Sequence, residues 1–317
     1  MIIDAHVHAF DRGFFPPAFA RATALRWRHA VWPPRPAGAL TPEAVEAGYV
    51  DPDGRLLAGD LEAAGVDAAV LMMLDHGIGL GEEAPVARDR ILEYYAGLAA
   101  RYPGRLYFFV GVDPRRPDAE SFLRRAAARG ARGLKLYPPD GFPCDHPAAV
   151  ALCRVCADLG LAVMFHTAFV GWPFEGDKAN PLALTAVQKA VPDLVLLVGH
   201  AGYPLWGPEA AAVVADHPGS YLEISQWQDL LDQDPGALVR VLADFRDRVG
   251  AHRIVFGSDH CSGPRFSGAR SRLAAWVRFV RDLPETAGRY GRRFTREEVD
   301  LILGGNMARI LGLAAPA

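Results

Sequence analysis

Two histidines stand two positions apart near the start of the chain, after a short apolar run. In a β-strand, side chains at positions i and i+2 point to the same face, so His6 and His8 can hold one metal ion between them. A catalytic zinc site uses about three protein ligands and leaves one position open for water. Further ligands must therefore come from elsewhere, and the candidates are His166, His200 and Asp259.

The elements that would position these residues follow a repeating pattern. Apolar runs rich in Val, Ile, Leu and aromatic residues alternate with helical patterns, which is typical of βα units around a parallel sheet. We predict strands at residues 2–6, 68–73, 106–112, 132–137, 162–166, 194–199, 221–224 and 254–257. We predict helices at 56–64, 87–102, 119–129, 147–159, 179–191, 210–216, 235–249 and 270–282, and final helical segments at 296–303 and 306–311.

Eight strands, each followed by a helix, predict a (β/α)8 TIM barrel in the α/β class. A doubly wound open sheet has a similar alternation and stays an alternative. Several predicted helices end in a glycine that suits the left-handed position after a helix, namely Gly65, Gly130 and Gly160. We find neither an internal repeat beyond the βα period nor an interdomain linker, so residues 1–317 are predicted to form a single domain.

The predicted barrel would bring the candidate ligands together. In a parallel barrel the carboxyl ends of all strands open on one face, where catalysis in this fold is found. His6 and His8 end the first strand, His166 the fifth, His200 the sixth and Asp259 the eighth. One histidine at a strand end is more often structural than a ligand, but five donors at strand ends on one face are hard to explain by chance.

The connection at residues 9–53 interrupts this rhythm with proline, arginine and aromatic residues. Loops of such length in compact domains are usually functional or disordered. Because the connection follows the first strand, it would rise over the face that carries His6 and His8. We therefore predict an insertion that acts as a lid or substrate wall, with a structural or oligomer-forming role as the alternative.

Composition and charge exclude several classes of protein. The chain has 317 residues, 50% of them hydrophobic and 22% charged, which indicates a globular protein with a large core. The net charge of -3 provides no basic field for nucleic acid. No apolar stretch is long enough for a transmembrane helix, and the amino terminus lacks the pattern of a secretory signal. With only four cysteines, we expect a reduced, cytoplasmic protein in which Cys153 and Cys156 are buried structural thiols rather than a redox or zinc motif.

Five short segments carry a resemblance to a known family. They are Asp4-Ala5-His6-Val7-His8, Phe165-His166, Gly199-His200-Ala201-Gly202, Phe256-Gly257-Ser258-Asp259 and Asn306-Met307-Ala308-Arg309-Ile310-Leu311. Together they resemble the amidohydrolase superfamily, and most closely its branch of aminocarboxymuconate semialdehyde decarboxylase, related aromatic-acid decarboxylases, hydratases and lactonases. The resemblance covers nearly the whole chain, and least clearly residues 9–53.

This resemblance implies a role for each donor. His6, His8, His166 and Asp259 would hold one divalent metal, usually zinc, with His200 beside it. Water bound to zinc has a pKa near 7, so Asp259 could accept its proton and later pass that proton to a leaving group. His200 could polarise a substrate carbonyl or hold the bound water.

Lys135 ends the fourth predicted strand and would face the same mouth. Some members of the superfamily carry there a carboxylated lysine that bridges two metals. We favour an unmodified ammonium group that anchors a substrate carboxylate or orients a ligand.

Weaker candidates follow the same strands. Aromatic residues in such loops are as often packing as substrate contacts. The group comprises Asp113, Glu223, Tyr137, Trp172, Trp206 and Trp227. Arg12 and Arg265 could bind an acidic substrate group, although solvated surface positions are the simpler interpretation. We expect surface or capping roles for His29, His76, His146, His217 and His252 and leave His260 open.

Three functions compete on this pattern. The leading hypothesis is a metal-dependent hydrolase that uses activated water on an amide, ester or lactone bond of a small molecule. The second is a non-oxidative decarboxylase or hydratase of an aromatic or enol-acid substrate on the same ligands. An arginine at the mouth that binds a carboxylate, together with release of CO2, would favour the second. A binding protein without catalysis is the third. We expect neither nucleic acid nor membrane as a partner and allow for a homodimer.

Overall fold

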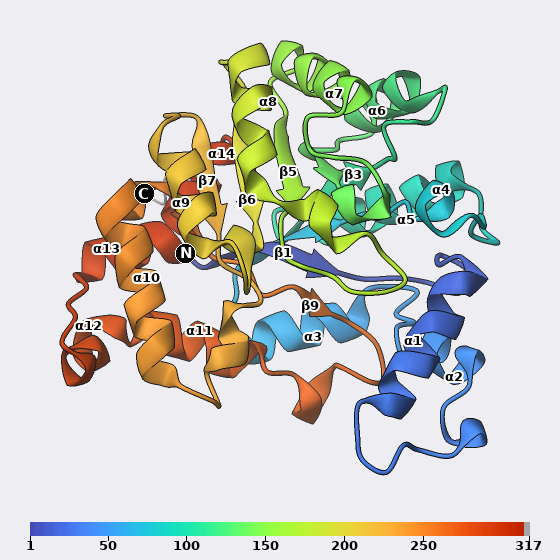
Figure 1. Cartoon of the computed structure of the whole chain (residues 1–317), viewed down its shortest axis with the longest axis horizontal. Coiled ribbons are helices and arrows are strands. Elements are labelled where there is room, and N and C mark those ends of the chain that lie inside the picture. Colours follow the sequence, from blue (N-terminus) through green and yellow to red (C-terminus); the bar gives the residue numbers. More distant parts are fainter. Residues whose placement is uncertain (314–317) are drawn as a thin grey trace.

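Nine parallel strands form one curled sheet in the computed structural model, which describes residues 1–313 (Figure 1). The strands are β1 (Ile3–His8), β2 (Ala68–Met72), β3 (Leu106–Gly111), β4 (Gly133–Leu136), β5 (Ala162–His166), β6 (Leu196–Gly199), β7 (Ser220–Glu223), β8 (Ile254–Val255) and β9 (His260–Cys261). Their order in the sheet is β8-β7-β6-β5-β4-β3-β2-β1-β9. The α/β class is thereby confirmed, and a strand is present at each predicted position.

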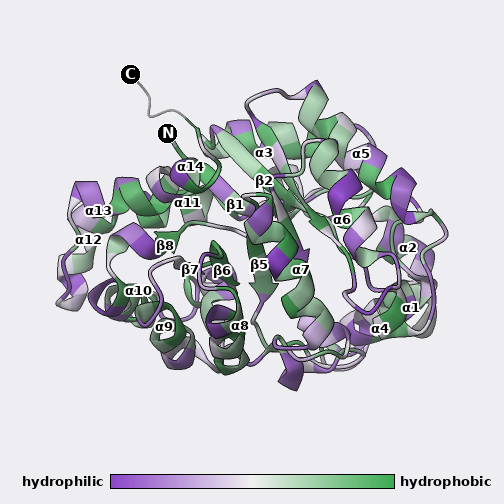
Figure 2. Cartoon of the chain, turned by 90° about the horizontal axis from the view of Figure 1, so that it is seen from above, coloured by the Kyte–Doolittle hydropathy of each residue, from purple (hydrophilic) through white to green (hydrophobic). Residues whose placement is uncertain are grey.

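Strand residues are apolar on both faces because both faces of the sheet are covered. Along β2, Val70 and Met72 belong to one buried cluster, while Ala69 and Leu71 belong to another. The first cluster fills the inside of the curl and the second meets the surrounding helices. Figure 2 shows the strands mostly in green, with helices of mixed colour around them. This double burial explains the continuous apolar runs in the sequence.

Helices connect successive strands and cover the outside of the sheet (Figure 1). The helices that follow the strands are α3 (Arg55–Ala64), α5 (Arg88–Arg101), α6 (Ala119–Ala128), α7 (Pro147–Asp158), α8 (Leu184–Ala190), α9 (Gly207–Ala215), α10 (Pro235–Val249) and α11 (Leu273–Arg281). Shorter ones are α4 (Gly77–Leu80), α12 (Leu283–Thr286), α13 (Arg296–Asp300) and α14 (Asn306–Ile310). The 3₁₀ turns are η1 (Ala37–Ala39), η2 (Pro138–Asp140), η3 (Gly176–Ala179), η4 (Pro181–Ala183), η5 (His200–Gly202), η6 (Trp227–Leu230), η7 (Ala251–Arg253), η8 (Gly268–Arg270) and η9 (Ala287–Tyr290), and η10 (Leu301–Gly305) is a π-helical turn.

Two predicted helices begin later than expected. The segment at 179–191 starts as the turns η3 and η4 and becomes helical only at Leu184. Asn180 has extended backbone angles, φ −61° and ψ 119°, because it precedes Pro181 and the proline ring disfavours a helical residue before it. The segment predicted at 270–282 begins at Leu273, after the turn η8.

The predicted strand at 254–257 is shorter than expected and ends at Val255, as β8, which pairs with β7. A further short strand that was not predicted, β9, follows at His260–Cys261 and pairs with β1 at the other end of the sheet. Backbone hydrogen bonds continue this contact, from Ala5 N to Phe256 O at 2.9 Å, from Asp259 N to His6 O at 2.8 Å and from Ser262 N to His8 O at 2.8 Å. Residues 254–262 therefore join the two ends of the sheet.

The long connection after β1 contains helices rather than an irregular loop. They are α1 (Pro17–His29) and α2 (Pro42–Ala47), which pack on each other and lie together at one edge of the molecule (Figures 1 and 2). A backbone bridge between Phe10 and Val50 brings the two ends of the connection together. No helix in residues 1–313 combines the length and the apolar character that crossing a membrane requires.

Candidate metal centre

Two imidazoles and one carboxylate meet where β1 and the β8–β9 segment lie side by side. Nε2 of His8 lies 3.1 Å from Oδ1 of Asp259, and Nε2 of His6 lies 3.4 Å from the same oxygen. One donor atom from each of the three residues lies within 4.8 Å of the other two. The spacing of the two histidines on β1 thus places both rings against a carboxylate that is 251 positions from His8 in the sequence.

The other nitrogen of each ring is occupied by an acceptor. Nδ1 of His8 lies 3.0 Å from the carbonyl oxygen of Met72, and Nδ1 of His6 lies 2.9 Å from Oε2 of Glu223. Because these oxygens accept hydrogen bonds, the neutral rings carry hydrogen on Nδ1 and turn an unprotonated Nε2 toward Asp259. Two nitrogen lone pairs beside a carboxylate repel each other unless a cation lies between them. The donor set therefore fits a divalent metal, and the outer contacts are those typical of metal-binding histidines.

His166 lies beside this group of three donors rather than within it. Its Nε2 contacts the carbonyl oxygen of Ala168 at 3.1 Å, which leaves Nδ1 as the nitrogen with a lone pair. That Nδ1 lies 2.8 Å from Nε2 of His200, and Nδ1 of His200 lies 2.7 Å from Oγ of Ser225. The structure therefore brings His6, His8 and Asp259 together and connects His166 to them through neighbouring imidazoles.

Glu223 connects the ring of His6 to nearby backbone groups through hydrogen bonds. Besides His6, its carboxylate accepts hydrogen bonds from the backbone N–H groups of His200 at 3.0 Å and Ser225 at 2.6 Å. It is fully buried. Room for this carboxylate depends on Gly257, because a Cβ atom at that position would lie 2.1 Å from Oε1 of Glu223. The sequence indicated Glu223 only as a weak candidate at the mouth, and its position within β7 makes it a support for His6.

Left-handed backbone conformations cluster at this site. The non-glycine residues with positive φ are His200 at 65°, Ala201 at 44°, Gln226 at 66° and Asp259 at 54°. Residues other than glycine rarely adopt such angles, and strained positions of this kind tend to occur at functional sites. Here the conformation turns the Gln226 amide toward Asp259, to which it donates a hydrogen bond of 2.9 Å at Oδ2.

Burial keeps the imidazoles neutral. It lowers the pKa of His6 and lowers the pKa values of His166 and His200 well below their ordinary range. Neutral imidazole is the form that binds metal. Burial also opposes ionisation of Asp259, but positive charge shared with His6 and His8 outweighs it and holds the pKa of Asp259 well below its ordinary value.

Lys135 reaches the centre from β4. It is almost completely buried, and its Nζ lies 3.4 Å from Nε2 of His6 and 3.5 Å from Sδ of Met164. Within residues 1–313 no carboxylate forms a salt bridge with this Nζ. Burial lowers the pKa of Lys135 to about 8, because the charged form loses its hydration.

A cavity of about 340 Å³ opens over these residues. His6, His8, His166, Lys135 and Asp259 line it, whereas His200 does not. Its remaining wall is largely aromatic, with Phe10, Phe15, Phe19, Tyr49, Tyr137 and Phe174. Several of these residues come from the connection after β1, which therefore forms part of the wall.

His76 and Arg26 are among the cavity residues that the sequence prediction missed. We expected a surface or capping role for His76, but its side chain is 4% exposed and it lines the cavity. That expectation is wrong, because position 76 follows β2 and its ring is covered by the connection after β1. Arg26 of α1 also lines the cavity. No short motif surrounds it, and only the packing of α1 places it there.

Among the weaker candidates, Tyr137 lines the cavity, but several others lie elsewhere. Asp113 forms an ion pair of 2.6 Å with Arg115, and Trp172 is 59% exposed. The guanidinium group of Arg265 stacks on Trp27 at 3.8 Å from the ring centroid. The contacts of Asp113 and Arg265 within the protein thus explain these two side chains without a bound substrate.

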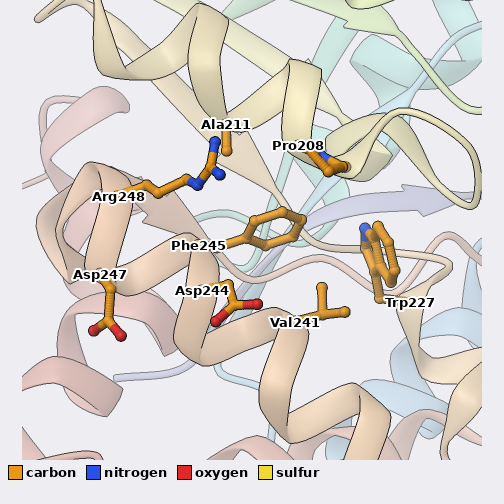
Figure 3. Close-up of a pocket in the computed structure, with 9 residues that line it drawn as sticks. Pro208, Ala211, Trp227, Val241, Asp244, Phe245, Asp247 and Arg248 are labelled. Carbon is orange, nitrogen blue, oxygen red and sulfur yellow. The ribbon is translucent and has the colours of Figure 1, made fainter.

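Trp227 belongs to a different cavity, of about 370 Å³, between α9 and α10 (Figure 3). Phe245 and Val241 lie beside its ring there, and none of the predicted metal ligands lines this cavity. The indole N–H donates to the carbonyl oxygen of His200 at 3.0 Å, so Trp227 supports the turn η5 from outside. Of these two cavities, only the central one is lined by predicted metal ligands.

Comparison with known proteins identifies a family for this arrangement. A family model described as amidohydrolase matches residues 3–313. The sequence has no match among curated proteins.

Solved structures share the fold at low sequence identity. One is a 5-carboxyvanillate decarboxylase from Novosphingobium aromaticivorans in complex with manganese and 4-hydroxy-3-methoxy-5-nitrobenzoic acid, with a TM-score of 0.67, 14% identity and coverage of 99% of this chain and 96% of that one. A 2,6-dihydroxybenzoate decarboxylase from Rhizobium matches with a TM-score of 0.63 and 14% identity, over 98% of this chain and 98% of that one. A putative 2-pyrone-4,6-dicarboxylic acid hydrolase from Pseudomonas putida matches with a TM-score of 0.62 and 17% identity, over 99% of this chain and 98% of that one.

Proposed function

The chain belongs to the amidohydrolase family, and from that premise we propose that it is a metal-dependent enzyme that releases CO2 from a small planar acid, aromatic or enolic. The observation that carries this proposal is the central cavity, in which an aromatic wall and Arg26 face the centre of His6, His8 and Asp259. The sequence favoured hydrolysis over decarboxylation. We reverse that order because an aromatic wall and an arginine are what an aromatic carboxylate requires.

The size and lining of the cavity suit a single-ring substrate. A volume of about 340 Å³ lies in the range of small-molecule sites, and aromatic side chains stack on planar rings. Tyr137 contributes a neutral hydroxyl group, because burial and the charges of Asp140 and Asp259 raise its pKa well above the ordinary value.

Two cationic side chains suit a carboxylate. Within residues 1–313, Arg26 has no carboxylate within 4 Å, so its guanidinium group can form charge-assisted hydrogen bonds with an acid. Lys135 lies deeper, beside His6, where its charged form would hold a second carboxylate oxygen.

His6, His8 and Asp259 would hold one divalent metal, with Nδ1 of His166 as the fourth donor. When bound, the ion supplies Lewis acidity, which withdraws charge from substrate oxygens and acidifies water. We propose zinc, as the nitrogen-rich donor set favours it, and a second ion only if Lys135 is carboxylated. The related decarboxylase from Novosphingobium binds manganese, so metal content per chain is the measurement that decides.

Asp259 is the residue that would move the proton. In the proposed reaction the bond between the ring carbon and the carboxylate carbon breaks, CO2 leaves, and the ring carbon takes up one proton. Asp259 is ionised at neutral pH and accepts a hydrogen bond from Gln226, so it can take a proton from solvent or substrate and deliver it to that carbon. His200 does not line the cavity; its Nε2 lies 2.8 Å from Nδ1 of His166, so a metal held by that Nδ1 would have His200 beside it.

Hydrolysis is the second candidate, on the same centre. Asp259 could equally accept a proton from attacking water, and the related pyrone hydrolase acts on a planar ring acid by its description. A cyclic ester that carries a carboxylate would also fit the aromatic wall.

A substrate panel in isotopically labelled water separates the two reactions. The metal-loaded enzyme is incubated with hydroxylated benzoic acids and with lactones in H2¹⁸O, and CO2 and product masses are measured. We expect CO2 and a ring product without ¹⁸O. Incorporation of ¹⁸O into an opened ring, with no CO2 from any acid, would overturn decarboxylation in favour of hydrolysis.

Arg26→Met tests the carboxylate contact. We expect KM for an acid substrate to rise about tenfold or more, since a charged hydrogen bond is lost, while metal content stays the same. Arg21→Met is the matched control, because Arg21 lies on the same helix but pairs with Glu82 at 2.6 Å. Equal KM values in the two variants would remove Arg26 from substrate binding.

The finer description of the fold is also a proposal. We infer a single TIM-barrel domain over residues 1–317 in which β8 and β9 together serve as the eighth strand. Residues 9–53 would be its insertion and substrate wall. The hydrogen bonds of residues 254–262 to β1 and the aromatic lining from the connection after β1 support this description.

A further inference from the structure

The rings around the central cavity form a continuous belt. Successive ring centroids lie close together from His8 to Phe10 (5.5 Å), Phe15 (4.4 Å), Phe19 (4.3 Å) and His76 (6.0 Å). The belt continues from His76 to Tyr137 at 4.8 Å and from Tyr137 to His166 at 4.4 Å. Outside the metal centre, His76 is therefore the imidazole of a wall that is otherwise phenyl and phenol rings.

A buried carboxylate fixes the orientation of His76. Its Nδ1 lies 3.0 Å from both oxygens of Asp140, and each of the two residues is 4% exposed. Because a carboxylate accepts hydrogen bonds, Nδ1 carries the hydrogen, and Nε2 is left for another partner. Among residues 1–313 no hydrogen bond occupies this Nε2, while the ring lines the cavity.

A purely structural role does not account for this pair. Burial raises the pKa of Asp140 and His76 opposes that shift, so the carboxylate depends on the imidazole. A buried pair of this kind contributes little stability compared with apolar side chains of the same volume. Phenylalanine at position 76 would continue the belt without needing Asp140, which points to a use for the polar ring.

The position of His76 suits a second polar group on the substrate. Tyr137 separates it from His166, so the imidazole and the metal centre lie about one aromatic ring apart along the wall. A substituted benzene ring spans a similar interval. A substrate whose carboxylate lies at the metal centre would direct another substituent toward His76.

We propose that His76, held by Asp140, is a specificity-determining residue for a second polar group on the ring of the substrate. Its neutral form accepts a hydrogen bond from a ring hydroxyl at Nε2, and its protonated form donates one from Nε2 to a second carboxylate. This inference rests on the proposed binding of a planar acid in the cavity, but it does not depend on which reaction follows. It predicts a preference for acids with two polar substituents over the same ring with one.

Two substitutions at position 76 test the roles of the two ring nitrogens one at a time. Asparagine places its amide nitrogen near the position of Nδ1, so His76→Asn keeps a donor for Asp140 and loses the group that faces the cavity. Glutamine reaches the position of Nε2, so His76→Gln keeps a polar group in the cavity. The probes are benzoate, 4-hydroxybenzoate and isophthalate, with binding to the metal-loaded protein measured by calorimetry.

For the native protein we expect 4-hydroxybenzoate or isophthalate to bind at least about tenfold more tightly than benzoate, the size of one hydrogen bond to a charged group. In His76→Asn this preference should disappear, while benzoate affinity, metal content and melting temperature stay nearly unchanged. In His76→Gln part of the preference should return. His146→Asn is the control, because His146 caps α7 through the N–H of Ala148 and does not line the cavity.

An unchanged preference in His76→Asn, or a native protein that does not discriminate among the three acids, would overturn the inference. A variant that loses stability but keeps its preference would show a structural pair and would also overturn it. Because the readout is binding, a lost preference supports the inference even where the labelled-water experiment rejects decarboxylation.

Discussion

Asp259 concentrates three properties in one residue. Its backbone is left-handed, its N–H donates to His6 O, and its carboxylate faces two imidazole nitrogens. The sequence could indicate the residue type and its place after a predicted strand. The left-handed angle, which aims the side chain back over β1, follows only from the hydrogen bonds made on both sides of it.

Asp259→Asn should retain most of the metal but lose about 10²–10⁴-fold in turnover, since the amide cannot exchange a proton as the carboxylate does. Metal content per chain and kcat on the best acid substrate are the measurements. Asp244→Asn serves as the matched control, because Asp244 lines the separate cavity between α9 and α10. Turnover of Asp259→Asn within twofold of the native rate would exclude the residue from proton transfer.

Residue types and spacing predicted part of the site. The His-x-His pair could be read directly, because a strand alternates its faces, and Asp259 joins that pair in the structure. His76 and Arg26 could not be found in this way. Their positions in the cavity depend on α1 packing over the sheet, and no local pattern records a contact between segments so distant in the sequence.

At the scale of elements, Gly257, which lies between β8 and β9, is a position where the packing leaves no room for a side chain. Gly257→Ala should displace Glu223 and, with it, His6, because the new Cβ would lie 2.1 Å from Oε1 of Glu223 and 3.1 Å from Cβ of His6. We expect a loss of about 1–3 kcal/mol in unfolding free energy and weaker metal binding.

Chemical denaturation and metal titration would test the Gly257 prediction. Gly97→Ala is the control: Gly97 lies within α5, and a Cβ atom added there would meet nothing within 4 Å, so alanine should stabilise that helix by about 0.5–1 kcal/mol. Full metal affinity in Gly257→Ala would contradict the tight fit around Glu223.

Asp60 ties α3 to the segment that follows Asp259. It accepts hydrogen bonds from the backbone N–H of Gly268 at 2.7 Å and contacts Nε2 of His260 at 2.8 Å. Burial opposes the charge, but these hydrogen bonds outweigh it and lower the pKa of Asp60 below its ordinary 3.8. A carboxyl group with a lowered pKa stabilises the fold above its unfolded pKa and loses that contribution as the pH falls through its folded pKa.

The melting temperature of Asp60→Asn should therefore lie below that of the native protein at pH 7, and the difference should shrink as the pH falls below about 4. Thermal unfolding from pH 7 to 3 is the measurement. A difference that stays constant over that range would show that the charge of Asp60 contributes nothing.

Element prediction succeeded where the period of the sequence is strong. The alternation of apolar runs and helical patterns located β1 to β8, since strands buried on both faces need continuous apolar runs, but it missed the two-residue β9. The late start of α8 was missed, although Asn180 precedes a proline and a residue in that position disfavours helical angles. The helices α1 and α2 were not predicted, although Pro17 and the Thr41-Pro42 pair are typical helix starts, because the richness in proline and arginine was interpreted as a loop.

For the whole molecule, the site is built from segments at opposite ends of the chain, so metal binding should stabilise the global fold. Removal of metal with a chelator should lower the unfolding free energy by about 2.7 kcal/mol relative to a protein with metal at 100 times its Kd. Differential scanning fluorimetry with and without added zinc measures the shift in Tm.

The double variant His6→Ala/His8→Ala provides the control for chelation. It should contain no metal, and its Tm should respond neither to the chelator nor to added zinc. Full metal occupancy in this variant would contradict the assignment of the two histidines, whatever the effect of the chelator on the native protein.

Docking of the segment between β8 and β9 would complete the sheet and assemble the proposed active site in the same step. Residues 254–262 connect β1 to β7 and β8, and Asp259, to which we assign proton transfer, lies in the middle of that segment. A nascent or partly unfolded chain in which this segment has not docked would therefore lack the proposed catalytic carboxylate at its site. If the proposed mechanism holds, enzymatic activity would itself indicate that residues 254–262 have docked against β1.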